Sequence, residues 1–177
     1  MMSRYLEFTR TRWGVSLLIL SCIAFSLTGC SEEAKAEHAP PNQWFEIQLG
    51  DKNIDVQIAY KQAEMAKGLM HRTSMGDNQG MIFFYDPPKQ MSFWMRNTKI
   101  ALDIGFFTSD GILSEVYPMY PMDETSVKSR RNDLLIALEM NLGWFAKNGI
   151  KPGDSFNLEM LKNALLKRGV QESKITF

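Results

Sequence analysis

The sequence predicts a mainly β protein with short helices, folded as a single compact domain of the β-sandwich or β-barrel type. Of its 177 residues, 45% are apolar and 11% are aromatic, which is enough for a substantial hydrophobic core. Between residues 44 and 160, short apolar segments recur at brief intervals and are separated by turn residues. About eight such segments can form strands, and only short stretches show helical periodicity. This pattern is typical of a sandwich or a barrel.

The expected strands follow from alternating side chains or from continuous apolar runs. Residues 44–49 and 54–58 alternate with period two, and Gly50-Asp51-Lys52-Asn53 between them is a hairpin signal. Residues 81–85 are all apolar or aromatic, which indicates a strand buried on both faces, and Asp86-Pro87-Pro88 is expected to end it. The other expected strands are residues 91–95, 103–108, 112–117, 134–140 and 156–160.

Three helices and one long loop complete the expected domain. Residues 62–69 carry apolar side chains at helical spacing, and residues 142–148 are expected to form a short helix. The loop over residues 119–132 is long for a compact domain, and such loops are usually functional or disordered. Residues 161–177 are expected to form an amphipathic helix, closed by Gly169, and a tail. The charged side chains that oppose the apolar ones on this helix are Lys162, Lys167 and Arg168.

The first 29 residues are expected to be a lipoprotein signal peptide. Three arginines precede a 15-residue apolar run, residues 13–27, which is shorter than the roughly 20 residues that span a bilayer. The run ends in Leu27-Thr28-Gly29-Cys30, which resembles a bacterial lipobox. The alternative is a transmembrane anchor with a coincidental Cys. We expect Cys30 to be lipidated, and residues 30–43, which are polar and contain two prolines, to be a flexible tether.

Lipidation would determine the location of the protein. Stable membrane anchoring takes two or more signals, and a diacylglyceryl Cys with a third acyl chain meets this requirement. We therefore expect a cell-envelope protein whose membrane partner is bound through Cys30. By resemblance to Gram-negative lipoproteins, Ser31 after the Cys favours the outer membrane, with the domain facing the periplasm.

Composition argues against several classes of function. Three of the 20 basic and one of the 20 acidic residues precede residue 30, which leaves 17 and 19 and no basic excess for binding nucleic acid. Cys22 and Cys30 are the two cysteines, so the chain after the leader has neither an internal disulfide nor a Cys-based zinc site. No phosphate loop, nucleophile elbow, dinucleotide fingerprint or paired metal-binding His motif is present. The sequence therefore predicts no cofactor and no metal site.

Residues 90–98 place two Met, a Phe and a Trp beside an Arg and an Asn, and Asp103 follows shortly. Large apolar side chains favour burial, whereas buried polar side chains need partners. We therefore expect a strand, a polar turn and a second strand at the rim of the core, with the Asn97 side chain satisfying the turn backbone. The candidate site residues are Arg72, Phe93, Trp94, Asn97, Asp103 and Glu139.

These residues allow two interpretations. In the structural one, Arg72 pairs with a carboxylate, Asp103 above all, in a buried network that fixes the turn, and Trp94 is a buried side chain beside it. In the functional one, the polar groups form the floor of a pocket under an aromatic wall of Phe93 and Trp94, which suits a small molecule or a sugar. An enzymatic version would use Asp103 and Glu139 as a carboxylate pair, provided that both face one cleft.

Several motifs in order resemble one known family. Phe93-Trp94-Met95-x-Asn97-Thr98, followed by Leu102-Asp103, is similar to the signature of the DUF192 family. The matching segments elsewhere are Gly68-Leu69-Met70-His71-Arg72, Gly80-Met81-Ile82-Phe83-Phe84-Tyr85, Asp110-Gly111, Leu138-Glu139 and Gly153-Asp154. The resemblance covers residues from about Phe45 to Leu161 and implies a compact, mostly β fold. It supplies no activity, because the family is uncharacterised.

The expected function is therefore a lipid-anchored binding or structural module of the cell envelope. Its partner would be a small molecule, a glycan or a protein. The alternative is an envelope hydrolase that uses Asp103 and Glu139.

Overall fold

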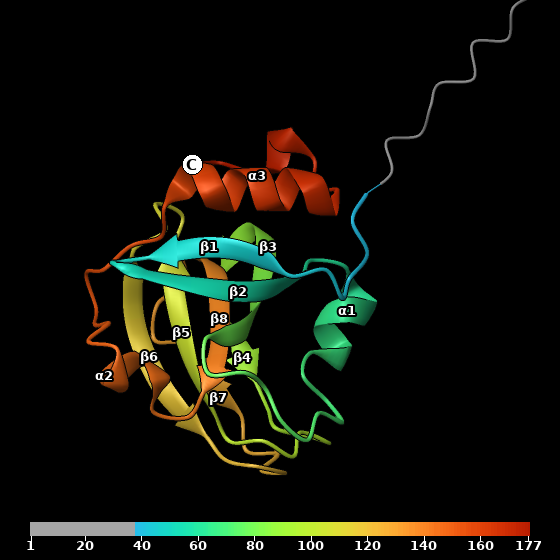
Figure 1. The fold of residues 1–177 in the computed structure, drawn as a ribbon, viewed down its shortest axis with the longest axis vertical. Helices are drawn as coiled ribbons and strands as arrows, with labels where there is room; N and C mark the ends of the chain where they lie inside the picture. Colours follow the sequence, from blue (N-terminus) through green and yellow to red (C-terminus); the bar gives the residue numbers. More distant parts are fainter. Residues whose placement is uncertain (1–37) are drawn as a thin grey trace, which may run out of the picture. The chain divides into compact units, whose positions relative to one another are not determined.

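Six strands form the central sheet of residues 38–177, the part of the chain that the computed structural model describes (Figure 1). The spatial order is β1-β2-β3-β8-β5-β6, with bounds β1 Phe45–Leu49, β2 Lys52–Ala59, β3 Gln79–Lys89, β8 Leu134–Asn141, β5 Leu102–Thr108 and β6 Leu113–Met119. β2 and β3 run parallel, whereas the other neighbouring strands of this sheet are antiparallel. A small ladder pairs β4, Ser92–Phe93, with β7, Val127–Lys128. The predicted signal peptide and Cys30 lie outside the described residues.

In residues 38–177, three α-helices and one 3₁₀ turn lie around the sheet. Their bounds are α1 Gln62–Lys67, α2 Trp144–Lys147, α3 Leu158–Arg168 and, for the 3₁₀ turn, Glu172–Lys174. α1 lies in the connection that makes β2 and β3 parallel. Figure 1 shows α3 alongside β1, at one edge of the sheet. Within residues 38–177, no helix is long and apolar enough to cross a bilayer.

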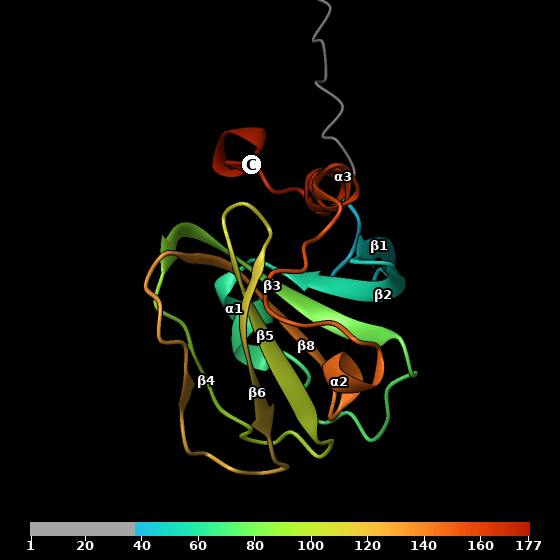
Figure 2. The same cartoon turned by 90° about the vertical axis from the view of Figure 1, so that its left-hand side faces the viewer.

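Both faces of the sheet are buried, each by different elements. On one face, called here the α2 face, side chains such as Ile82 and Leu138 pack with α2, α3 and the tail. On the other, called the α1 face, side chains such as Phe83 and Ala137 pack with Leu69 after α1 and with buried methionines around β4. Figure 2 shows the sheet between the β4–β7 ladder and α2. Because each face has its own core, the side on which a residue points decides its neighbours.

Alternation along β5 and β8 separates the two candidate carboxylates. Asp103 on β5 lies opposite Met140 on β8, and Met140 belongs to the core of the α2 face. Ile104 lies opposite Glu139, and Ile104 belongs to the core of the α1 face. Directly opposed residues point to the same face and successive residues to opposite faces. Asp103 therefore belongs to the α2 face and Glu139 to the α1 face.

A glycine allows α2 to approach the sheet closely. Gly105 on β5 points to the α2 face, and a Cβ built on it would lie 2.8 Å from the ring of Phe145 in α2. Such a contact is too short for any side chain, so only glycine leaves room for this ring. Phe145 itself is buried in the core of that face.

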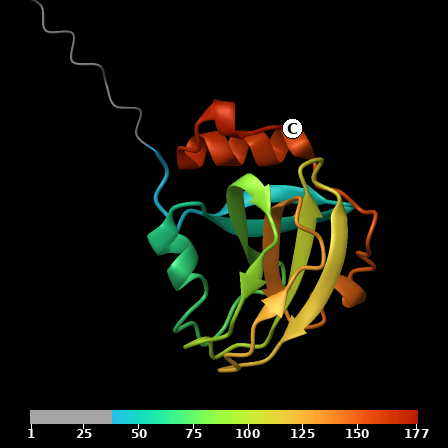
Figure 3. The ribbon, with the colours of Figure 1, turned by 180° about the vertical axis from the view of Figure 1, so that it is seen from behind.

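One buried cation joins the C-terminal helix to the rest of the domain. Arg168 is 1% exposed, and its guanidinium donates from Nε to the Ile58 carbonyl oxygen at 3.1 Å and from Nη1 to that of Ala39 at 2.6 Å. Nη2 lies 2.9 Å from Glu64 Oε2, an ion-pair distance at an angle outside hydrogen-bond geometry. The group also lies 5.2 Å from the Tyr60 ring centroid. Figure 3 shows the C-terminal end of α3 above α1, where this ion pair forms.

The predicted fold class is confirmed, with a correction to the architecture. The domain is mainly β with short helices, but its sheet is open and mixed and does not close into a barrel, because the end strands β1 and β6 do not pair with each other. The expected strand over residues 156–160 is wrong. The Asn157 side chain accepts a hydrogen bond from Met160 N at 3.1 Å and starts α3 there instead.

Two further strand boundaries differ from the prediction. β3 does not end at residues 86–88 but continues to Lys89, and its register with β8 shifts between Phe84 and Lys89. The prolines thus occupy an interrupted part of the ladder, where no backbone donor is needed. The strand expected over residues 91–95 is only the two residues of β4, because the chain turns directly after it.

Candidate functional site

The turn after β4 is built mainly by backbone contacts. Thr98 N donates to the Met95 carbonyl oxygen at 3.0 Å and closes the turn. Asn97 has a φ of 55° and is exposed, and its carbonyl oxygen accepts from His71 N at 2.8 Å. Asn tolerates this left-handed backbone better than most residues, which explains its presence. The expected side-chain contact is absent from residues 38–177, where Asn97 contributes its backbone conformation and its carbonyl oxygen.

The long segment after β6 is ordered against the same stretch. Met91 N donates to Ser129 Oγ and Ser129 N to the Met91 carbonyl oxygen, both at 3.0 Å. Met95 N donates to the Asp123 carbonyl oxygen at 2.8 Å, and Met122 N to that of Thr98 at 3.0 Å. These contacts flank the β4–β7 ladder on both sides. The segment is thus held against β4 and the turn after it and is not a disordered loop.

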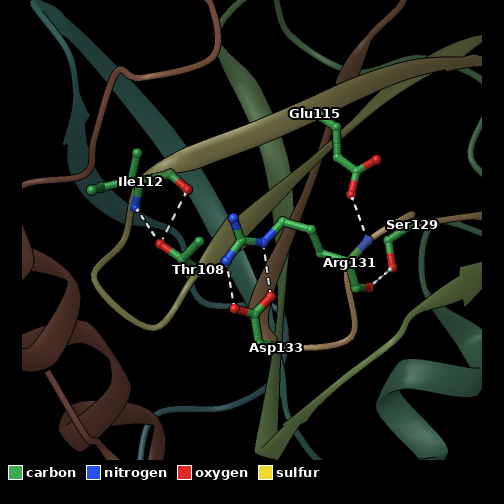
Figure 4. A network of polar contacts seen from close by, with 6 residues as sticks. All are labelled: Thr108, Ile112, Glu115, Ser129, Arg131 and Asp133. Atoms are coloured by element: carbon green, nitrogen blue, oxygen red, sulfur yellow. Dashed lines mark hydrogen bonds and ion pairs between the residues drawn. The ribbon is translucent and has the colours of Figure 1, made fainter.

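A polar network fixes this segment to β6 and to the start of β8 (Figure 4). The Glu115 carboxylate accepts from Arg130 N and Arg131 N at 3.0 and 3.3 Å. The Arg131 guanidinium binds Asp133 through two hydrogen bonds, and its carbonyl oxygen accepts from Ser129 Oγ at 2.9 Å. Through Ser129, the network reaches Met91 beside β4. The position of β4 therefore depends on the charged side chains of Glu115, Arg131 and Asp133, which do not belong to the predicted site.

A cavity of about 450 Å³ lies on the α1 face between α1, β3 and β4. Its volume falls within the range of small-molecule sites. Three of the six predicted site residues do not line it. The lining residues used below are Tyr60, Met65, Lys67, Leu69, Tyr85, Lys89, Phe93, Trp94, Thr98 and Glu139.

The aromatic wall of the cavity contains both predicted aromatic residues, in different surroundings. Phe93 is half-buried and packs edge-on against Phe83, with ring centroids 5.0 Å apart, and against Tyr85 at 6.5 Å. Trp94 is 49% exposed, and the Arg96 guanidinium lies 5.8 Å from its ring centroid. The expectation of a buried Trp94 is therefore wrong, because the turn after β4 directs it to the rim of the cavity. An exposed Trp at a cavity rim is a contact surface and contributes little to the core.

Glu139 is the buried acidic residue of the cavity. It is 5% exposed, on the α1 face of β8, and its carboxyl has no hydrogen-bond or ion-pair partner among residues 38–177. Burial raises the pKa of the Glu139 carboxyl to about 8. Burial, and then the charge of Glu139, raise the pKa of Tyr85 to about 12. Among residues 38–177, Arg168 Nη2 is the one polar side-chain atom that is fully enclosed and makes no hydrogen bond. The Glu139 oxygens also make no hydrogen bond, so they are not fully enclosed and open into the cavity that Glu139 lines.

Arg72 and Asp103 do not meet, and the predicted ion pair between them is wrong. Asp103 Oδ2 accepts from Gly143 N at 2.8 Å on the α2 face, at the start of α2. Burial raises the pKa of Asp103, and this hydrogen bond opposes the rise. The Arg72 guanidinium donates to Gln57 Oε1 and lies 5.6 Å from the Trp44 ring centroid. Burial lowers the pKa of Arg72. Both residues are therefore satisfied locally.

The carboxylate pair of the hydrolase alternative is also wrong. Asp103 and Glu139 lie on neighbouring strands but point to opposite faces of the sheet. A glycosidase-type pair must face one cleft from two sides. A sheet with a packed core on each face cannot present these two carboxyls to one substrate.

Two other hollows offer less to a ligand. A groove of about 730 Å³ beside α3 has exposed polar side chains, His38, Glu46 and Lys167, and no buried polar group among its lining residues to orient a ligand. A cavity of about 570 Å³ on the other side of α1 contains Arg72, which Gln57 already satisfies. The cavity at Glu139 is smaller than both but combines a buried, open carboxyl with an aromatic wall.

Comparison with known proteins assigns a family. The family model DUF192, described as uncharacterized ACR, matches residues 45–158, well over half of the chain. The chain belongs to the DUF192 family. The resemblance of the sequence motifs is thereby confirmed. No curated protein matches the chain.

Two solved structures are similar to this DUF192 protein. One is a protein of unknown function from Novosphingobium aromaticivorans, with 38% identity and a TM-score of 0.62 over 68% of this chain and 91% of that one. The other, from Sinorhizobium meliloti, is described as a candidate transcription regulator, with 26% identity and a TM-score of 0.64 over 67% of this chain and 96% of that one. Both support the fold, and neither adds a described activity to the DUF192 domain.

Sequence reasoning missed several residues of the DUF192 cavity. Tyr85 is the last residue of the apolar run 81–85, Lys89 follows the prolines that are expected to end this strand, and Met65 lies on α1. Alternation along β3 places Tyr85 on the same side as Phe83. This alternation can be deduced from the sequence. The sequence could not show that Tyr85 and Glu139 lie on the same face of the sheet, because that depends on how β3 pairs with β8.

Proposed function

We propose that the domain is a binding module and that its site is the cavity between α1, β3 and β4. The supporting observation is Glu139, a buried carboxyl without a partner in residues 38–177 that opens into an aromatic-walled cavity. A buried carboxyl without a partner destabilises a fold, so a purely structural module gains nothing from it. Polar groups with strongly shifted pKa values in cavities are characteristic of functional sites.

A ligand screen tests this proposal on the full-length chain. Small molecules that raise the melting temperature are retained, because binding to the native state stabilises it. Each is then tested with Trp94→Ala and Glu139→Gln, which change the rim and the floor of the cavity. Tyr120→Ala is the matched control, since Tyr120 is an aromatic residue that is 57% exposed and does not line the cavity.

We expect the stabilisation to fall in both cavity variants and to persist in the control. Stabilisation that persists in both cavity variants would place the ligand elsewhere, and the proposal would be wrong. The groove beside α3, lined by Trp44 and Met160, would then be the next candidate.

We also propose that the module is attached to the cell envelope by lipid on Cys30, at the outer membrane and facing the periplasm. Support comes from the apolar run and the Leu27-Thr28-Gly29-Cys30 motif. Ala39 is hydrogen-bonded to Lys167 and Arg168 of α3, so only the seven residues from Ser31 to Glu37 would be free, and they would hold the domain within roughly 25 Å of the membrane. Cys30→Ala should abolish incorporation of labelled fatty acid. A variant that still fractionates with membranes at mature size would refute lipid attachment at this residue.

We do not extend the transcription role named for the Sinorhizobium meliloti protein to this chain. The near-equal numbers of basic and acidic residues after residue 30 support a partner other than nucleic acid. Filter binding of the full-length chain to duplex DNA at low salt checks this, and binding that weakens steeply with added salt would contradict it.

A further inference from the structure

The chemistry of the cavity at Glu139 restricts what it can bind. Glu139 is the acidic residue among the residues that line it, and its carboxyl is buried without a donor in the described part of the chain. A desolvated carboxylate is stabilised most by a charged donor, because charge-assisted hydrogen bonds are stronger than neutral ones. An anionic group at the same position would hold Glu139 in its protonated form, and above the pKa of about 8 it would meet a like charge in a poorly solvated space.

The aromatic walls of the cavity also favour a positively charged ligand. The faces of Trp, Tyr and Phe rings attract cations. Cations of the chain itself already lie against three aromatic lining residues: Lys89 Nζ is 4.5 Å from the Tyr85 ring centroid, Lys61 Nζ is 5.4 Å from that of Tyr60, and the Arg96 guanidinium is 5.8 Å from that of Trp94.

The cavity also has room for more than a charged group. Its volume of about 450 Å³ and the side chains of Met65, Leu69 and Phe93 provide an apolar wall for a ligand body. We propose that the cavity binds an organic ammonium ion, with the positive group at Glu139 and an apolar body against Phe93 and Trp94. This inference rests on the proposed binding function and specifies its ligand class.

Binding of such an ion is coupled to proton release. The pKa of Glu139 is about 8, so the carboxyl is mostly protonated at neutral pH and ionises when the ammonium group binds. The other titratable groups that face the cavity are Tyr60, Tyr85, Lys67 and Lys89. The pKa of Tyr85 is about 12, so Tyr85 keeps its proton between pH 7 and 9, where Glu139 ionises. Affinity should therefore rise about tenfold over that range.

Three probes with one body separate the head-group charges. They are 2-phenylethylamine, 2-phenylethanol and 3-phenylpropionate, titrated into the full-length chain up to about 10 mM, since fragments of this size bind at about millimolar Kd. The readout is the NMR signal of the Trp94 indole N–H, assigned by its loss in Trp94→Phe. We expect the amine to bind about tenfold more tightly than the alcohol, and the acid to bind most weakly.

Two variants test independently how the charges of Glu139 and Lys89 affect binding of the amine. Glu139→Gln should remove the preference for the amine over the alcohol. Lys89→Gln should strengthen binding of the amine about twofold or more and leave the alcohol unchanged, because a like charge leaves the rim. Lys99→Gln is the control, since Lys99 is exposed and does not line the cavity.

The outcomes separate this inference from the function on which it rests. If the amine binds no more tightly than the alcohol, or if Glu139→Gln keeps the preference, the ammonium site is refuted while the binding cavity stands. If none of the three probes shifts the Trp94 signal, both proposals are refuted. A tenfold preference that is lost in Glu139→Gln supports both.

Discussion

Glu139 makes the stability of the domain depend on pH. Its pKa is about 8 in the folded chain and near the usual 4.5 when unfolded, so only the folded state keeps the proton between these values. Stability is then fully present below the unfolded pKa and is lost as the pH rises through the folded one. The loss over this window is roughly 3–5 kcal/mol, at 1.36 kcal/mol per unit of pKa shift.

Glu139→Gln should therefore flatten the dependence of the unfolding free energy on pH. Urea unfolding between about pH 5 and 9 measures this, and the variant should be the more stable protein at the alkaline end. Asp103→Asn is a comparison on the α2 face and should keep the slope contributed by Glu139. Equal slopes for the wild type and Glu139→Gln would show that Glu139 is ionised or partnered in solution.

Arg168 is the residue on which the C-terminal helix depends. Arg168→Met would leave the Glu64 carboxylate and the carbonyl oxygens of Ile58 and Ala39 without this donor. Removing one member of a buried ion pair costs roughly 3–5 kcal/mol. Lys167→Met is the matched control, because Lys167 is adjacent but exposed and should change stability by less than about 0.5 kcal/mol. Denaturant unfolding compares the two, and equal costs would refute the role of Arg168.

The elements differ in how much of them the sequence could predict. The hairpin of β1 and β2 and the short α1 follow from alternation and turn residues, which are local signals. The charge of Arg168 predicts the exposed side of its helix, although Arg168 lies three residues after Leu165 and seven after Leu161, on the same helical face. The helical spacing therefore indicates that Arg168 is buried. Its charge favours the opposite prediction, because fully buried cations are uncommon.

The start of α3 differs from the prediction for another reason. Residues 156–160 are apolar enough for a strand, and only the cap decides between strand and helix. Asn157→Ala should remove the acceptor for Met160 N and destabilise the domain by about 0.5–2 kcal/mol. Asn163→Ala, inside α3 and exposed, should be neutral or slightly stabilising because Ala favours helices. Thermal unfolding distinguishes the two, and equal effects would mean that the cap is not formed.

At the scale of the whole molecule, the arrangement of the faces decides the candidate site. Three of the residues that the sequence motifs indicate, Phe93, Trp94 and Glu139, line one cavity. The motifs could not show that Asp103 lies on the α2 face or that Arg72 lines the cavity on the other side of α1. Strand order and register, which decide both positions, are not local properties of the sequence. Residue types that suit one site were therefore grouped together although the fold separates them.

This separation predicts that the two carboxylates titrate independently. Carboxyls that share one cleft and interact strongly titrate as a pair, and removing one then shifts the other by more than about one pKa unit. Because Asp103 and Glu139 point into different cores, Asp103→Asn should leave the pKa of Glu139 at about 8. NMR titration of the Glu139 carboxyl carbon measures this value in both proteins. A fall of one unit or more in Asp103→Asn would show that the two groups interact through the sheet, and the single-carboxylate site would have to be replaced by a coupled pair.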